Sequence, residues 1–142
     1  MNSFSKTLPE QRPDEAQYAK EIWQTLGCQD PLTKSFIRMA ILAIKVFDFK
    51  QTRYGTGNIA AGGELGVRLR LSDKSARLMN LMKKGAEPED ETVEDTFGDV
   101  GVYGLIGLMA RYGLWPGVDG AHPQAEKKED GSFKVEETEA AA

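Results

Sequence analysis

The sequence predicts an all-α fold, a single compact bundle of about four helices followed by a disordered acidic C-terminal tail. In four segments, apolar residues recur at intervals of three and four, as on one face of a helix. Proline and glycine punctuate these segments at their ends. Residues 65–71 alternate as a strand does, but the chain offers no second alternating segment to pair with them. At 142 residues, the chain has room for one domain.

The domain is predicted to span residues 13–118 and to begin with a helix over 14–26. Residues 1–12 show no periodicity and are expected to form a flexible N-terminal lead. Pro13 suits the start of a helix and Gly27 its end. An apolar stripe is expected to face the core, formed by Ala16, Ala19, Ile22, Trp23 and Leu26.

A second helix is predicted over residues 31–51. Asp30 is a suitable cap for free backbone amides, and Pro31 fits the first helical position. We expect the helix to end in the glycine-rich stretch "YGTGNIAAGG", whose glycines allow left-handed turns. Its predicted buried side consists of Phe36, Met39, Ala40, Ala43, Ile44 and Phe47.

A third helix over about 63–84 carries a polar row opposite its broad apolar stripe. The row is spaced three, four, three and four and consists of Arg70, Asp73, Arg77, Asn80 and Lys84. A fourth helix is predicted over 91–112, with glycines at every third position from 98 to 107. Such glycines cost stability in a helix, so we expect either tight helix packing or a groove for a ligand or a second molecule.

The charge distribution argues against general nucleic-acid binding. Residues 119–142 hold seven acids and three bases and are predicted to be a disordered acidic tail, which leaves fifteen of each sign in residues 1–118. Cys28 is the only cysteine, and no secretion signal opens the chain, so a cytoplasmic protein is expected. The longest apolar run, 100–110, is shorter than the roughly 20 residues of a membrane helix.

Oxygen ligands and cations are the groups available for chemistry. The only histidine, His122, lies in the tail, which argues against catalysis or metal binding through histidine. On the fourth helix, Glu91, Asp95 and Asp99 are spaced by four and share one face, with Glu94 beside them. Asp99 lies where that helix becomes apolar, so we expect a cation or a metal beside it.

Two hypotheses explain these charges. In the structural one, Asp73 and Arg77 form an ordinary salt bridge within their helix. In the functional one, the third and fourth helices face each other, and carboxylates hold a hard cation such as Mg²⁺ while basic side chains hold phosphates. The metal ligands would be Asp73, Asp95 and Asp99, with Glu91 or Glu64 in addition, and the phosphate ligands would be Arg70, Lys74 and Arg77. Tyr54 could stack on a base and Asn58 donate a hydrogen bond, although "YGTGN" lacks the lysine of a P-loop.

Residues 48–112 resemble the nucleotide modification associated domain family, type 1, of phages and prophages. The resemblance rests on "YGTGNI", "GELGVRLRLSDKSARLMNLM" and "ETVEDTFGDVGVYGLIGLM". It implies a homodimeric protein that acts on nucleotides. The site residues it implies are Tyr54, Gly55, Asn58, Arg70, Asp73, Lys74, Arg77, Asn80, Glu94, Asp95, Thr96, Asp99 and Tyr103.

The last helix is also similar to that of MazG-type all-α nucleoside triphosphate pyrophosphohydrolases. Those enzymes bind magnesium through Glu-x-x-Glu and Glu-x-x-Asp pairs, whereas this chain has Thr96 three residues before Asp99 and no Glu-x-x-Glu in the preceding helix. Two functional hypotheses follow. The first is Mg²⁺-dependent hydrolysis of a dNTP to dNMP and pyrophosphate, with Asp73, Asp95 and Asp99 as the catalytic residues. The second is a non-catalytic nucleotide-binding module, either a partner in a modification system or a sponge for a nucleotide signal.

Overall fold

The computed structural model describes residues 13–85 and 91–121 and contains four α-helices in these ranges, with no strand. The helices are α2 (Pro13–Thr25), α3 (Thr33–Tyr54), α4 (Gly57–Lys84) and α5 (Val93–Arg111). The all-α prediction is therefore confirmed. The predicted N-terminal lead and nearly all of the predicted acidic tail lie outside the described residues.

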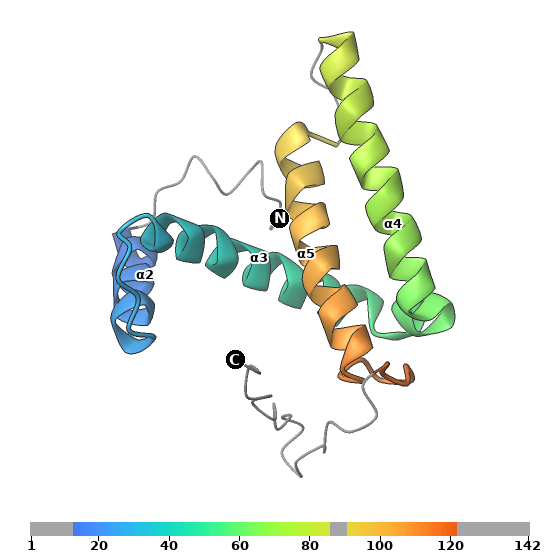
Figure 1. Ribbon diagram of the computed structural model, residues 1–142, viewed down its shortest axis with the longest axis horizontal. Helices are drawn as coiled ribbons and strands as arrows, with labels where there is room; N and C mark the ends of the chain where they lie inside the picture. The colour runs from blue at the N-terminus through green and yellow to red at the C-terminus, as the bar shows by residue number, and fades with distance from the viewer. Residues whose placement is uncertain (1–12, 86–90, 122–142) are drawn as a thin grey trace, which may run out of the picture.

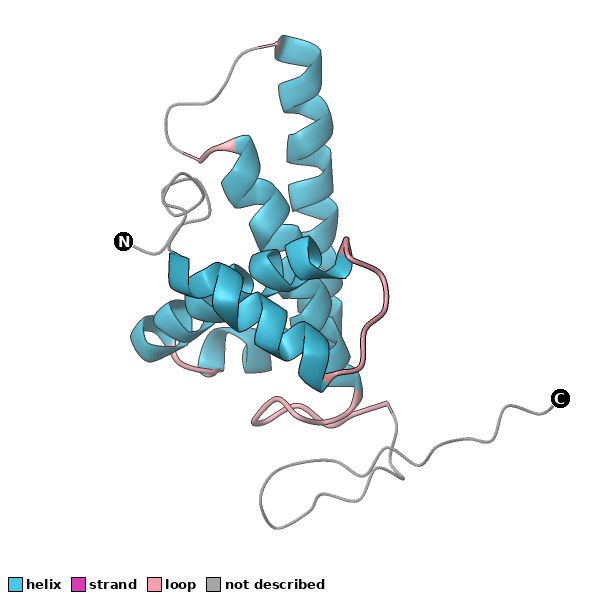
Figure 2. Ribbon diagram, turned by 90° about the vertical axis from the view of Figure 1, so that its left-hand side faces the viewer, coloured by secondary structure: helices cyan, strands magenta, loops and turns pink. Residues whose placement is uncertain are grey.

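Helices α4 and α5 form an antiparallel pair and lie side by side along most of their length (Figure 1). Helix α2 packs against α3 at the other end of the molecule and runs at a steep angle to it in this view. Helix α3 crosses at a steep angle to reach the middle of α5, and Figure 2 shows the same crossing from the side. None of the described helices is both long and apolar enough to cross a membrane.

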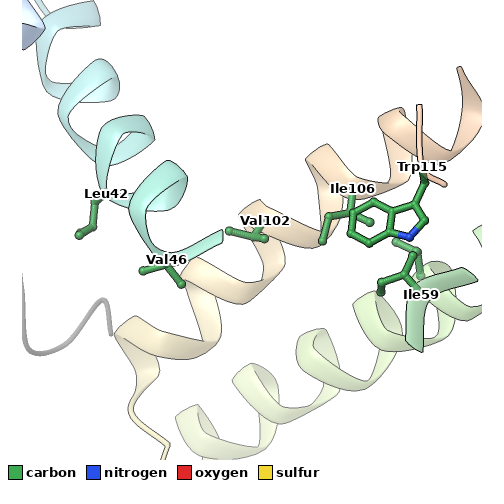
Figure 3. Close-up of a cluster of buried hydrophobic side chains, with 7 residues drawn as sticks. Leu42, Val46, Ile59, Val102, Ile106 and Trp115 are labelled. Carbon is green, nitrogen blue, oxygen red and sulfur yellow. The ribbon is translucent and has the colours of Figure 1, made fainter. Parts of the chain in front are cut away.

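The hydrophobic core lies where α3 meets the α4–α5 pair. The cluster includes Leu42 and Val46 of α3 and Val102 of α5, and Figure 3 shows Val46 near Val102 and Trp115 at the far end beside Ile59. The Trp115 indole N–H donates to the Thr56 carbonyl oxygen at 3.1 Å, so the polar atom of this buried ring is satisfied. The segment after α5 is thereby tied to the start of α4.

Helix ends follow the local signals in the sequence. The Asp30 carboxylate accepts a hydrogen bond from the Leu32 amide at 2.8 Å, as expected of a capping residue, and the regular helix begins at Thr33. Gly55 ends α3 with a φ of 64°, which few other residues adopt. Gly63, with a φ of 58°, kinks α4 where the sequence predicted the helix to begin.

The predicted buried side of α3 is wrong at three positions. Phe36, Met39 and Ile44 are exposed, while Ile37, Leu42 and Val46 are the buried residues of this helix. The helix carries apolar residues on more than one side, so periodicity alone does not determine which side packs against α2 and α5. Of the stripe predicted for the first helix, Ala19 is buried and Trp23 is partly buried, whereas Ala16, Ile22 and Leu26 are exposed.

The tight packing expected of the α5 glycines is not found at Gly101, Gly104 or Gly107. A Cβ at Gly107 would lie 3.6 Å from the Val67 Cγ1 atom, an ordinary van der Waals distance. Gly101 and Gly104 are exposed and have open space beside them.

Replacing both Gly101 and Gly104 with alanine is expected to stabilise the protein by about 1 to 2 kcal/mol. Each glycine lies inside a helix with room for a methyl group, and alanine is favoured there by up to about 1 kcal/mol. Urea unfolding followed by circular dichroism measures the change. Gly63→Ala is the control and should destabilise, because its φ of 58° is strained for alanine. A loss of stability in the double variant would contradict this prediction.

Candidate functional site

A chain of ion pairs joins α3, α4 and α5 on one side of the bundle. Asp99 Oδ1 lies 2.9 Å from Lys50 Nζ, and Asp99 Oδ2 lies 3.0 Å from Lys74 Nζ. Lys74 also pairs with Glu91, and Glu91 in turn pairs with Arg77, whose Nε is 2.9 Å from its Oε2. We call these five residues the Lys74 network.

The backbone places the members of this network. Lys74 and Arg77 lie one turn apart on α4 and face the start of α5. Thr92 caps α5 by accepting from the Asp95 amide at 3.1 Å, which fixes the preceding Glu91 at the helix end. The Glu91 carbonyl oxygen accepts from the Arg77 guanidinium at 2.8 Å, so both the backbone and the carboxylate of Glu91 are held.

The network lowers the pKa of Asp99 and raises the pKa of Lys74, and both shifts favour the charged form of the side chain. Burial raises the pKa of Asp99, but hydrogen bonds from Lys50 and Lys74 outweigh it and hold that pKa below its usual 3.8. Burial lowers the pKa of Lys74, and the hydrogen bonds to Glu91 and Asp99 outweigh it, so the net shift is upward. The prediction that Asp99 needs a cation beside it is confirmed, and the cations are Lys50 and Lys74.

Asp99→Asn is expected to make the free energy of unfolding less dependent on pH in the acidic range. A carboxylate whose folded pKa lies below 3.8 stabilises the protein above that pH, and this contribution is lost as the pH falls through the folded pKa. Urea midpoints between about pH 3 and 7 should therefore vary less in the variant, with a loss of about 1 kcal/mol at neutral pH. Glu94→Gln, an exposed acid on the same helix, is the control. An unchanged acid dependence in Asp99→Asn would exclude Asp99 as a source of it.

A pocket of about 110 Å³ opens next to the network, between α3, the start of α4 and the middle of α5. Its walls combine aromatic rings, amides and both signs of charge. The lining residues are Phe47, Lys50, Gln51, Tyr54, Gly55, Asn58, Ile59, Arg70, Asp99, Val102, Tyr103 and Ile106. Sites that enclose a whole small molecule measure about 300 to 1,000 Å³, so this pocket has room for one part of a nucleotide, with the rest on the surface.

Arg70 is the cation held in this pocket without a carboxylate. Its Nη2 donates to the Asn58 Oδ1 atom at 2.9 Å, and its guanidinium lies 5.7 Å from the centre of the Tyr103 ring. Within residues 13–85 and 91–121, Arg70 has no ion-pair partner, whereas Lys50 beside it is paired with Asp99. The remaining donors of Arg70 are available to an anion.

The structure brings together many of the predicted site residues but not the predicted metal ligands as a group. Tyr54, Asn58, Arg70 and Asp99 meet in the pocket, and Lys74, Arg77 and Glu91 lie in the adjoining network. Among the described residues, no three acids, histidines or cysteines are placed to hold a metal ion. Magnesium binding stays a prediction.

Asp73 and Asn80 lie apart from this pocket, in a shallow groove that they share with Arg77. Arg77 pairs with Glu91, which precedes α5, and forms no salt bridge with Asp73, so the structural hypothesis for that pair is wrong. Glu64, a further predicted ligand, accepts from Arg111 of α5 at 2.8 Å and from Arg68. Asp73, Asn80 and Glu64 therefore lie outside both the pocket and the network.

Three pocket residues are absent from the predicted site: Lys50, Gln51 and Phe47. They line the pocket from α3 with Tyr54, at positions 47, 50, 51 and 54, which share one helix face. This spacing is a signal in the sequence, although Phe47 is predicted there only as a core residue. Lys50 and Asp99 are 49 residues apart, so no local pattern pairs them.

Comparison with protein-family models, with curated proteins and with solved structures gives no match for this chain. The fold and the site therefore define it only in general terms, as an all-α protein with a mixed aromatic and charged pocket between three helices. The resemblance to nucleotide modification associated domains remains an expectation from its motifs.

Proposed function

We propose that the protein is a nucleotide-binding module and that its ligand enters the pocket around Arg70. The observation that carries the proposal is the position of Arg70, held by Asn58 and Tyr103 with no carboxylate partner among the described residues. A guanidinium fixed in this way, in a partly apolar pocket, favours a planar or phosphate-bearing anion.

The surroundings of Arg70 suit the parts of a nucleotide. Tyr54 is 73% exposed at the pocket edge, so its ring is accessible for stacking on a base. Gly55 and Asn58 flank the N-terminus of α4, where backbone amides and the helix dipole favour a phosphate. The amide group of Gln51 adds a further hydrogen-bonding side chain to the wall.

Binding has more support in this geometry than hydrolysis. Hydrolysis by a MazG-like route requires carboxylates free to bind magnesium, but the Asp99 and Glu91 oxygens are engaged by Lys50, Lys74 and Arg77. A metal ion at Asp99 would have to displace two ammonium groups. The arrangement therefore gives less support to a magnesium centre than to a binding site, and the module is the better-supported hypothesis.

One experiment separates the two functions. The purified protein is titrated calorimetrically with each dNTP and NTP, with and without Mg²⁺, and the same mixtures are assayed for pyrophosphate. The proposal predicts saturable binding of at least one nucleotide and no pyrophosphate above the background. Pyrophosphate release that is lost in Asp99→Asn would support the hydrolase, and absence of both binding and turnover would contradict both functions.

The biological setting is part of the same proposal. The motifs similar to phage nucleotide modification associated domains suggest a cytoplasmic homodimer that works with nucleotide-modifying enzymes or sequesters a nucleotide signal. Nucleotides, rather than nucleic acids, are the proposed ligands, because acids and bases balance over residues 1–118.

A further inference from the structure

Among the described residues, the side of α4 opposite Val67 carries exposed apolar side chains, and the last of them, Met79, also lines a groove with Val93 and Phe97 of α5. Leu65 is 67% exposed, Leu69 58% and Met79 52%, and Ser72 and Ala76 between them are also exposed. Val67, on the opposite side of the helix, is buried against α5. We call Leu65, Leu69, Ser72, Ala76 and Met79 the outer stripe.

The outer stripe has the spacing of a coiled-coil seam. Its members follow one another at intervals of four, three, four and three residues, a heptad pattern that keeps one narrow line of contact along a helix. An ordinary amphipathic surface helix has one apolar side, whereas α4 has two and uses one of them for α5. The outer stripe is therefore suited to another helix.

The charges that flank the stripe favour a second copy of α4 in parallel orientation. In heptad terms, Arg68 precedes the core position Leu69, and Asp73 follows the core position Ser72. In a parallel pair these two flanking positions, five residues apart, face each other across the seam, so Arg68 meets Asp73 of the partner subunit twice by symmetry. An antiparallel pair centred on Ser72 would instead bring the two copies of Asp73 together.

Both charged groups are available for this contact. Asp73 is exposed and has no ion-pair partner among the described residues. Arg68 donates to Glu64 through Nε and Nη2, and its side chain is 65% exposed, so further guanidinium donors face solvent.

We propose that two copies of this chain associate through their α4 helices, parallel and in register, with the outer stripe as the seam and Arg68–Asp73 pairs on both flanks. The seam rests on the homodimer that forms part of the proposed function, but it lies apart from the Arg70 pocket, so a failure of nucleotide binding would leave it standing. Ser72 and Ala76 are small and allow the helices to approach closely at the middle of the seam.

Sedimentation equilibrium of the full chain tests the seam. The wild-type protein should be a dimer, and Leu69→Glu should shift it to a monomer with unchanged helical circular dichroism, because Leu69 is exposed in the monomer. Leu26→Glu, at another exposed leucine after α2, is the matched control and should remain dimeric. A monomeric wild-type protein, or dimers unaffected by Leu69→Glu, would overturn the proposal.

Charge exchange tests the orientation. Arg68→Asp and Asp73→Arg should each weaken the dimer by about tenfold or more, and the double variant should regain most of the affinity. In a Cys28→Ser background, Met79→Cys should form a disulfide-linked dimer under mild oxidation. Failure of the double variant to recover, or crosslinking only when Leu65→Cys and Met79→Cys proteins are mixed, would rule out the parallel pair.

Discussion

Replacing Trp115 with alanine is expected to lower the free energy of unfolding by about 3 to 5 kcal/mol, a large part of the total for a domain of this size. The Trp115 ring is 2% exposed, meets the Phe47 ring edge-on at 6.1 Å and hydrogen-bonds the Thr56 carbonyl oxygen. The variant loses this contact between the end of α5, the start of α4 and α3. Urea and thermal unfolding, followed by circular dichroism, measure the loss.

Trp23 provides a matched control for this change. Its indole N–H also donates to a backbone carbonyl oxygen, that of Asp30, but the ring is only partly buried at the edge of the α2–α3 pair. Trp23→Ala should cost less than half as much as Trp115→Ala. Equal losses in the two variants would show that the core does not centre on Trp115.

Arg70→Ala is expected to weaken nucleotide binding by about 10- to 100-fold, since hydrogen bonds to charged groups contribute about 1.5 to 3 kcal/mol. Arg70→Lys should recover only part of the affinity, because lysine keeps the charge but not the planar set of donors. The measurement is calorimetric titration with whichever nucleotide binds the wild-type protein. Stability should change little, since Arg70 has no ion pair among the described residues.

Arg53→Ala is the control for the loss of a positive charge. Arg53 lies three residues from Lys50 on α3 and stacks on Phe49 at 5.1 Å, and it does not line the pocket. Its loss should leave affinity within about twofold of the wild type, because exposed charges at a distance contribute little at physiological salt. An equal effect of Arg53→Ala and Arg70→Ala would mean that net charge, rather than the pocket, determines binding.

The helices could be predicted from the sequence because their limits depend on local residues. Asp30 caps a helix through an amide two residues away, and Gly85 ends α4 with a left-handed φ of 65°. The alternation over 65–71 lies in a helix, as the lack of a second alternating segment predicts. Within this helix Val67 is buried, whereas Leu65 and Leu69 are exposed.

The arrangement of the helices depends on contacts that no local pattern contains. The exposure of Phe36 and Ile44 and the burial of Ile37 follow from where α2 and α5 lie against α3. The sequence predicted that Asp99 needs a balancing cation, but not that Lys50, 49 residues earlier, is one of the two lysines that pair with it. The separation of Asp73 from Asp99 follows likewise from how α4 turns toward α5.

Amide chemical shifts measured by NMR during nucleotide titration test whether the pocket around Arg70 binds a nucleotide. The largest shifts are predicted at Gly55, Asn58 and Tyr103, with α2 unaffected. In Arg70→Ala these shifts should disappear at the same nucleotide concentration. Shifts centred on α2, or none at saturating dNTP and NTP concentrations, would contradict the claim.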